Sequence, residues 1–144
     1  FKTTNMNESK ILNRDMASII SKQGHGDLLL VVDAGFAIPK ELDVLDISLD
    51  ENKPMVIEVL ATLRKIFSVE KIYMADETKK VNPTFFENVS NMWGKAVPVE
   101  TVSHVHLKEM SKQVKAVIRT GDFTAYGNVI LVSGSGERWY SEKP

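Results

Sequence analysis

The sequence contains no cysteine. This absence excludes disulfide bonds, thiolate nucleophiles and cysteine-ligated metal sites, and it leaves the redox compartment open. An excess of either sign of charge is also missing, because 18 Lys and Arg balance 19 Asp and Glu to a formal net charge of −1. A nucleic-acid partner is therefore not expected, since such partners require a basic stripe. A small, uncharged ligand or a protein partner fits this composition better.

Long apolar runs are absent as well. No stretch approaches the roughly 20 residues of a membrane span, so we expect no membrane partner. No signal peptide is visible. The sequence begins with Phe1 rather than Met, which suggests that the natural start lies upstream. We expect a cytoplasmic protein, or an exported one if a signal peptide preceded Phe1.

Several motifs of common enzyme classes are missing. No glycine pattern matches a phosphate-binding loop or a dinucleotide fingerprint, which argues against a nucleotide-binding regulatory domain. No nucleophile elbow is found. His104 and His106 are two residues apart and would face the same side of a strand, a spacing that can ligate zinc. No third ligand is evident, so we predict neither a metal site nor a cofactor.

The 144 residues, 43% of them hydrophobic, suffice for one domain with its own core. Strand-like and helix-like segments alternate, which predicts a single-domain α/β fold with a largely parallel sheet flanked by helices. We expect strands at residues 27–35, 44–49, 71–76, 99–104, 115–121 and 126–134. We expect helices at residues 11–22, 54–68, 82–93 and 106–114, with Pro54 at a first helical position and Asn82 as an N-cap.

The chain falls into three predicted parts. Residues 1–9 are polar and aperiodic and are interpreted as a loose arm. Residues 10–134 form the α/β domain. Residues 135–144 form a polar tail with two aromatic residues, which we expect on the surface or on a neighbouring subunit.

Polar residues follow most of the predicted strands. Ligands of α/β proteins bind beyond the carboxyl ends of the strands. Asp33 follows one strand and either binds a ligand hydroxyl or caps the next turn. Asp76 and Glu77 follow another, as a carboxylate pair or as a solvated helix start. The segment "RTGDFTAYGN", residues 119–128, is either a hydrogen-bonded, hairpin-like turn or a loop that binds a polyol.

His25 lies between two glycines in "QGHGDLLLVVDAG". Glycine allows the backbone to approach a ligand closely, but His25 could equally be a histidine of a surface turn. Asp27, two residues later, is interpreted as a loop acid that orients either the His25 imidazole or a backbone amide.

Taken together, the motifs "GHGD", "DAGFAIP", "ADE", "NP", "VSH" and "RTGDFTAYGNVILVSG" resemble the D-ribose pyranase and fucose mutarotase family of bacterial sugar-handling proteins. The similarity extends from about Lys10 to Gly134. It implies an enzyme that interconverts ring forms of a free monosaccharide, D-ribose by preference, without metal or cofactor. It also implies a ring-shaped homo-oligomer, a decamer, with the site at a subunit interface.

The resemblance assigns roles to individual residues. His25 occupies the position of the catalytic acid. The positions that contact the sugar in this family are occupied here by Asp33, His104, Tyr126, Gly127 and Asn128. Gly127 is expected to contribute only through its backbone. Asp27 and Asp122 are expected to support them.

Some residues depart from the family pattern. "DAGFAIP" and "RTG" resemble the ribose branch, whereas Tyr126-Gly127-Asn128 leans toward the fucose branch. Asp122 replaces the usual Glu, Ala125 replaces the usual Pro, and the tail after Gly134 is longer than usual. A mutarotase for fucose or another sugar, and a non-catalytic sugar-binding protein, therefore remain as alternatives.

The chemistry of ring exchange suits a histidine. Opening the ring requires a proton delivered to the ring oxygen and a proton removed from the anomeric hydroxyl. An imidazole with an ordinary pKa of about 6.5 gives and takes protons near neutrality.

The spacing along the first strand argues against a site within one chain. The six steps from Asp27 to Asp33 span about 20 Å when extended, and the eight from His25 about 26 Å. One sugar cannot contact both ends, so we expect His25 of one subunit to act with Asp33 of another.

Overall fold

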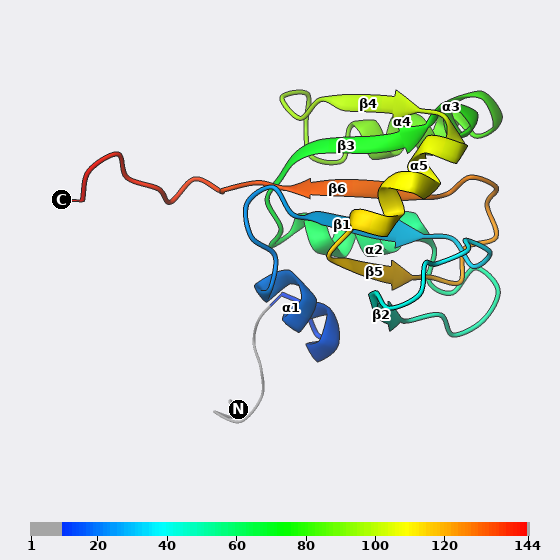
Figure 1. Cartoon of the computed structure of the whole chain (residues 1–144), viewed down its shortest axis with the longest axis horizontal. Helices are drawn as coiled ribbons and strands as arrows, with labels where there is room; N and C mark the ends of the chain where they lie inside the picture. Colours follow the sequence, from blue (N-terminus) through cyan, green and yellow to red (C-terminus); the bar gives the residue numbers. More distant parts are fainter. Residues whose placement is uncertain (1–9, 144) are drawn as a thin grey trace, which may run out of the picture.

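The computed structural model describes residues 10–143, so the predicted arm at residues 1–9 lies outside the described part (Figure 1). Six strands form one sheet in the order β2-β5-β1-β6-β3-β4. The strands are β1 (Leu28–Val32), β2 (Asp43–Asp46), β3 (Val69–Ala75), β4 (Val99–Val102), β5 (Ala116–Arg119) and β6 (Val129–Ser133). The α-helices are α1 (Arg14–Ser21), α2 (Val56–Arg64), α3 (Asp76–Val81), α4 (Pro83–Ser90) and α5 (His104–Met110), and a 3₁₀ turn, η1 (Ser111–Gln113), follows α5.

The sheet is mixed and mostly parallel, which confirms the predicted fold class. β5 pairs in parallel with both β1 and β2, and β3 pairs in parallel with β4. β6 runs antiparallel between β1 and β3 and joins the two parallel groups. Of the two interpretations of residues 119–128, the hairpin-like turn is excluded, because β1 lies between β5 and β6.

The central strand β1 is covered on both faces, as its continuous apolar sequence predicts. Side chains alternate between the faces of a strand. Leu29 and Val31 accordingly belong to the larger core cluster, with residues of α1, α2 and α4. Leu30 and Val32 belong to a smaller cluster with Leu107 of α5. Figure 1 shows the same layers, with α5 in front of the sheet and α2 and α4 behind it.

Two local predictions are wrong, and a third is confirmed in position only. Pro54 is not in the first turn of α2, because Met55 is the N-cap and the helix begins at Val56. Asn82 is the N-cap of α4, as predicted, but its side chain makes no capping bond and donates instead to the carbonyl of Ala125.

His104 and His106 lie on a helix rather than a strand. Ser103 ends the strand region and caps α5, because its hydroxyl accepts the amide of His106 at 3.1 Å. Residues two apart on a helix do not share a face. The zinc-like spacing of the two histidines therefore has no geometric basis.

Among residues 10–143, no helix is both long and apolar enough to cross a membrane.

Candidate active site

Asp33 directly follows β1, at the edge where β1, β3, β4 and β5 end and β6 begins. Its carboxylate accepts the amide of Gly35 at 3.1 Å and that of Gly127 at 3.3 Å. Its own amide donates to Oδ1 of Asn128 at 3.0 Å. Burial raises the pKa of Asp33 above its ordinary value, although the amides of Gly35 and Gly127 oppose the rise. The structure therefore holds a half-buried carboxyl group in a fixed orientation.

A hollow of about 360 Å³ opens beside Asp33, within the usual range for small-molecule pockets. It brings together four of the residues that the sequence singled out, from three separate segments. Its lining includes Asp33, Phe36, His104, Lys108, Tyr126 and Asn128.

His104 contributes an unsatisfied polar atom to this region. Its Nδ1 is buried and has no hydrogen-bond partner among the described residues. Its ring meets Phe36 and Tyr126 edge-on, with centroids 6.2 and 5.2 Å away. The backbone amide of His104 donates to the carboxylate of Glu77 at 3.1 Å, which fixes the start of α5. Buried polar atoms are normally paired, so Nδ1 is a candidate ligand-binding atom.

Tyr126 adopts a left-handed backbone conformation with φ of 56°. This region is unfavourable for a bulky residue unless surrounding contacts enforce it. The hydroxyl of Thr78 in α3 donates to the Tyr126 carbonyl at 2.6 Å, and Asn82 holds the preceding carbonyl of Ala125. Two elements outside the loop therefore impose the turn that places the Tyr126 ring on the hollow.

Asp122 is almost fully buried, with 2% of its surface exposed. One carboxylate oxygen accepts the Val56 amide at 2.8 Å, and the other accepts the Thr124 amide at 2.7 Å. Asp122 thus supplies a side-chain cap for α2 and shapes the loop before Tyr126. It lines a second hollow of about 390 Å³ on the other side of Asp33.

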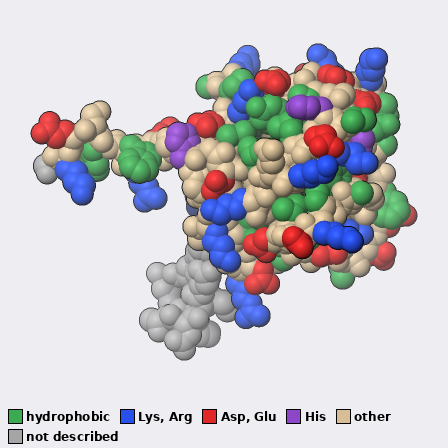
Figure 2. Space-filling model, viewed as in Figure 1, with side chains coloured by type: hydrophobic (Ala, Val, Ile, Leu, Met, Phe, Trp, Pro, Cys, Tyr) green, Lys and Arg blue, Asp and Glu red, His purple; other side chains and the backbone are tan. Residues whose placement is uncertain are grey.

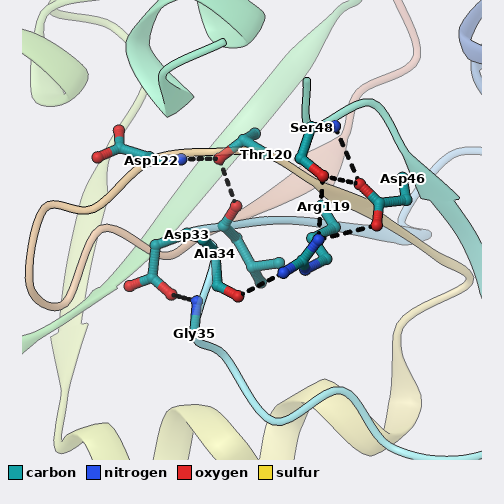
Figure 3. Close-up of polar contacts among 9 residues, drawn as sticks. Asp33, Ala34, Gly35, Asp46, Ser48, Arg119, Thr120 and Asp122 are labelled. Atoms are coloured by element: carbon teal, nitrogen blue, oxygen red, sulfur yellow. Dashed lines mark hydrogen bonds and ion pairs between the residues drawn. The ribbon is translucent and has the colours of Figure 1, made fainter. Parts of the chain in front are cut away.

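Arg119, at the end of β5, connects this edge of the sheet to β2 (Figure 3). Its Nη1 donates to Oδ2 of Asp46 at 2.9 Å and to the hydroxyl of Ser48 at 3.0 Å. Its Nη2 donates to the carbonyl of Ala34 at 2.9 Å. Next to it, the Thr120 hydroxyl donates to the carbonyl of Val32 at 2.8 Å.

His25 lies before β1 begins, at the opposite end of that strand from Asp33. Its side chain is 57% exposed, and its Nε2 is 2.9 Å from Oε2 of Glu70 in β3. Asp27 does not contact the imidazole. It accepts the Gly24 amide at 2.7 Å and Nζ of Lys115 at 3.0 Å, and these two interactions lower its pKa. Of the two roles considered for Asp27, the structure shows the contact with a backbone amide.

The two candidate regions are separated by the length of β1. The six steps from Asp27 to Asp33 correspond to about 20 Å, as the sequence suggested. Figure 2 shows histidine side chains at opposite sides of one face, with charges of both signs scattered between them. One chain therefore brings together Asp33, His104, Tyr126 and Asn128 but leaves His25 apart.

Comparison with known proteins places these residues in a known context. The model of the RbsD / FucU transport protein family matches residues 6–135. The chain belongs to this family. A D-ribose pyranase from Clostridium perfringens is 40% identical over 129 residues, which are 90% of this chain and 98% of the relative. A D-ribose pyranase from Pseudothermotoga lettingae is 36% identical over the same length, covering 92% of that relative.

Solved structures of RbsD/FucU proteins have the same fold. Bacillus subtilis RbsD complexed with D-ribose aligns with a TM-score of 0.87 and 35% identity, over 92% of this chain and all of the other. FucU from Bifidobacterium longum aligns with a TM-score of 0.72 over 90% of this chain and 99% of the other. Its 19% identity supports the fold alone.

Four polar residues at the two regions of this RbsD/FucU chain were missed by sequence reasoning. Glu70 and Asp46 each act across the sheet on a residue far away in the chain. Only the order of the strands brings them into contact, and the sequence carries no signal for that order. Lys108 lies one helical turn after His104, so the helical spacing of "HVHLK" could have indicated it. No pattern in the sequence indicated a role for Ser48.

Proposed function

We propose that this protein is an isomerase that interconverts the pyranose and furanose forms of free D-ribose. The observation that carries the proposal is the hollow around Asp33 with the unpaired Nδ1 of His104, in a chain 40% identical to a D-ribose pyranase. The volume suits one monosaccharide, and the donors and acceptors suit its hydroxyl groups.

The residues of the hollow hold the sugar. Asp33 accepts hydrogen bonds from one or two hydroxyls, and Nδ1 of His104 bonds to another. Tyr126 and Asn128 orient the remaining hydroxyls, and Gly127 contributes through its backbone. This arrangement determines which hydroxyl closes the ring after opening, because catalysis of an intramolecular reaction depends on orientation.

His25 moves the protons. Its Nδ1 accepts the proton of the anomeric hydroxyl and delivers a proton to the ring oxygen, which opens the ring to the aldehyde and leaves the imidazole neutral again. Attack by a different hydroxyl then reverses both transfers, so that protons and electrons balance over the cycle. The Glu70 carboxylate only accepts hydrogen bonds, so it holds Nε2 as the N–H and leaves Nδ1 for the sugar.

Because His25 and Asp33 lie at opposite ends of β1, we propose that each site combines two subunits. His25 comes from one subunit and the hollow from its neighbour, in a ring-shaped homo-oligomer that we expect to be a decamer. A ring follows naturally when different surfaces of identical chains meet head to tail. We further propose that the enzyme works in the cytoplasm, which fractionation of cells would test.

Saturation-transfer NMR on free ribose tests the function directly. The protein should accelerate pyranose–furanose exchange, and His25→Ala should abolish the acceleration while leaving ribose binding intact. Accelerated α–β exchange of L-fucose alone would assign the enzyme to the fucose branch, toward which Tyr126-Gly127-Asn128 leans. Ribose binding without any acceleration would identify a non-catalytic sugar-binding protein.

A further inference from the structure

The edge strand β2 contributes little to the core, which raises the question of its role. Its four residues are mostly exposed, and only Leu45 is partly buried against the main cluster. It nevertheless pairs with β5 along its whole length, with Asp46 opposite Arg119. The pairing continues beyond the strand, where the Ile47 amide donates to the Arg119 carbonyl at 3.0 Å. The end of β2 is thereby held against Arg119.

We infer that Arg119, anchored by Asp46 and Ser48, is a positioning residue that fixes the Asp33 loop for sugar binding. This inference rests on the role of Asp33 proposed above. Arg119 lines the neighbouring hollow of about 390 Å³ and is not among the residues around His104. It acts on the sugar through the backbone of Ala34, not by contact.

The peptide units around Ala34 are held from two sides. The amide of Ala34 donates to the carbonyl of Asp122 at 2.8 Å, and its carbonyl accepts Nη2 of Arg119 at 2.9 Å. The Ala34 carbonyl and the Gly35 amide belong to the same peptide unit, and that amide donates to the Asp33 carboxylate. A rotation of this peptide unit would therefore move the Asp33 carboxylate. In Figure 3, Arg119 lies between the Asp46–Ser48 side and the Ala34 carbonyl and bridges the two.

Arginine is suited to this bridge, whereas lysine is not. The guanidinium group donates in two directions in one plane, which allows it to contact Asp46, Ser48 and Ala34 together. A lysine ammonium could retain the pairing with Asp46 but could not span all three acceptors. The ion pair itself is partly exposed, at 34% for Arg119 and 48% for Asp46, and such pairs contribute little to stability. The more important effect of the Arg119 contacts is therefore to orient the loop that contains Asp33 and Ala34.

Arg119→Lys tests the inference. We expect the Kd and KM for ribose to rise about tenfold, comparable to the loss of one charge-assisted hydrogen bond. We expect kcat to change less than about twofold, because the loss of an interaction that serves binding alone raises KM without lowering kcat. Hydrogen exchange at the Ala34 amide should accelerate, while exchange at Val31 in β1 stays unchanged. Asp46→Ala should produce the same pattern.

The pair Lys71–Glu100 provides a matched control. It also joins neighbouring strands, with a 2.8 Å contact and exposures of 33% and 52%, but it lies between β3 and β4. Glu100→Ala should leave Kd and hydrogen exchange at Ala34 as in the wild type. Ser48→Ala removes only a hydroxyl group and should raise Kd about two- to threefold, which keeps the test available if larger changes disturb assembly.

Two results would overturn the inference: an unchanged Kd in Arg119→Lys and Asp46→Ala, or a fall in kcat at constant KM. Binding is measured by equilibrium titration with ribose, independently of turnover. A wild-type protein that binds ribose without catalysing exchange would therefore contradict the proposed function and leave the role of Arg119 testable. Normal catalysis with an unchanged Kd in these variants would contradict the role of Arg119 alone.

Discussion

Mixing two inactive variants tests whether neighbouring subunits share the site. His25→Ala removes the proposed acid, and Asp33→Ala removes the central acceptor of the hollow. β1 lies between these residues, and the extended backbone from Asp27 to Asp33 alone spans about 20 Å within one chain. Each variant alone should be inactive, because every site in it lacks one of the two groups.

The expected recovery follows from how the subunits combine. Each shared site takes His25 from one subunit and Asp33 from its neighbour. In an equal, random mixture of the two variants, half of the subunits supply an intact histidine and half supply an intact hollow. About a quarter of the sites are then complete, so we expect about a quarter of wild-type activity. If each chain formed its own site, no site would be complete.

The assay is ribose exchange by NMR after the variants are refolded together, with native mass spectrometry to count mixed assemblies. Equal mixing of His25→Ala with wild type is the control, and about half of the wild-type activity should remain. Mixed assemblies that are no more active than the single variants would refute the shared site. Such a result would require the loop that contains His25 to fold over the sheet within its own chain.

Three further predictions concern stability. A Cβ at Gly121 would lie 2.3 Å from the carbonyl oxygen of Asp50, so Gly121→Ala should lower the free energy of unfolding by about 3 kcal/mol. An unchanged urea midpoint would contradict this. Asp122→Ala removes the buried acceptor of the first amide of α2, and the loss should be about 2 kcal/mol in the same assay; a loss below about 0.5 kcal/mol would speak against the cap. Hydrogen bonding to the Gly24 amide lowers the pKa of Asp27. An acid with a lowered pKa stabilises the fold above its unfolded pKa of about 3.9 and loses that contribution as pH falls through the folded pKa. Asp27→Asn should therefore be less stable than wild type at neutral pH, the two should converge in acid, and parallel pH profiles of the thermal midpoint would disprove the linkage.

The sequence was sufficient to predict the strands and the fold class. The apolar run of β1 marked it as buried on both faces, and the structure confirms that burial. The direction of β6 could not be predicted, because an apolar run carries no information about the direction of its neighbours. The same limit explains why a hairpin-like turn at residues 119–128 could not be excluded beforehand, since strand order depends on packing of the whole chain.

The candidate site was predicted in part. Residues that follow parallel strands converge at one end of the sheet by topology, which is why Asp33 and the segment at residues 119–122 could be grouped in advance. The expected roles of Tyr126 and Asn128 came from the family resemblance. Contacts across the sheet, such as His25 with Glu70, depend on which strands become neighbours. The expected strand at His104 was wrong because Ser103 caps a helix there, and a serine before a helical stretch is a recognisable start signal.

The central position of β6 has a consequence for how the chain folds. Among the described residues, β6 is the last strand, yet it is the strand that joins the group β2-β5-β1 to the pair β3-β4 in the sheet. On the ribosome, neither group can be joined to the other until residues 129–133 have left the exit tunnel. Such late, long-range pairing makes folding slow and leaves strand edges exposed on the nascent chain. The sheet should therefore close only once β6 becomes available, after the other five strands have been synthesised.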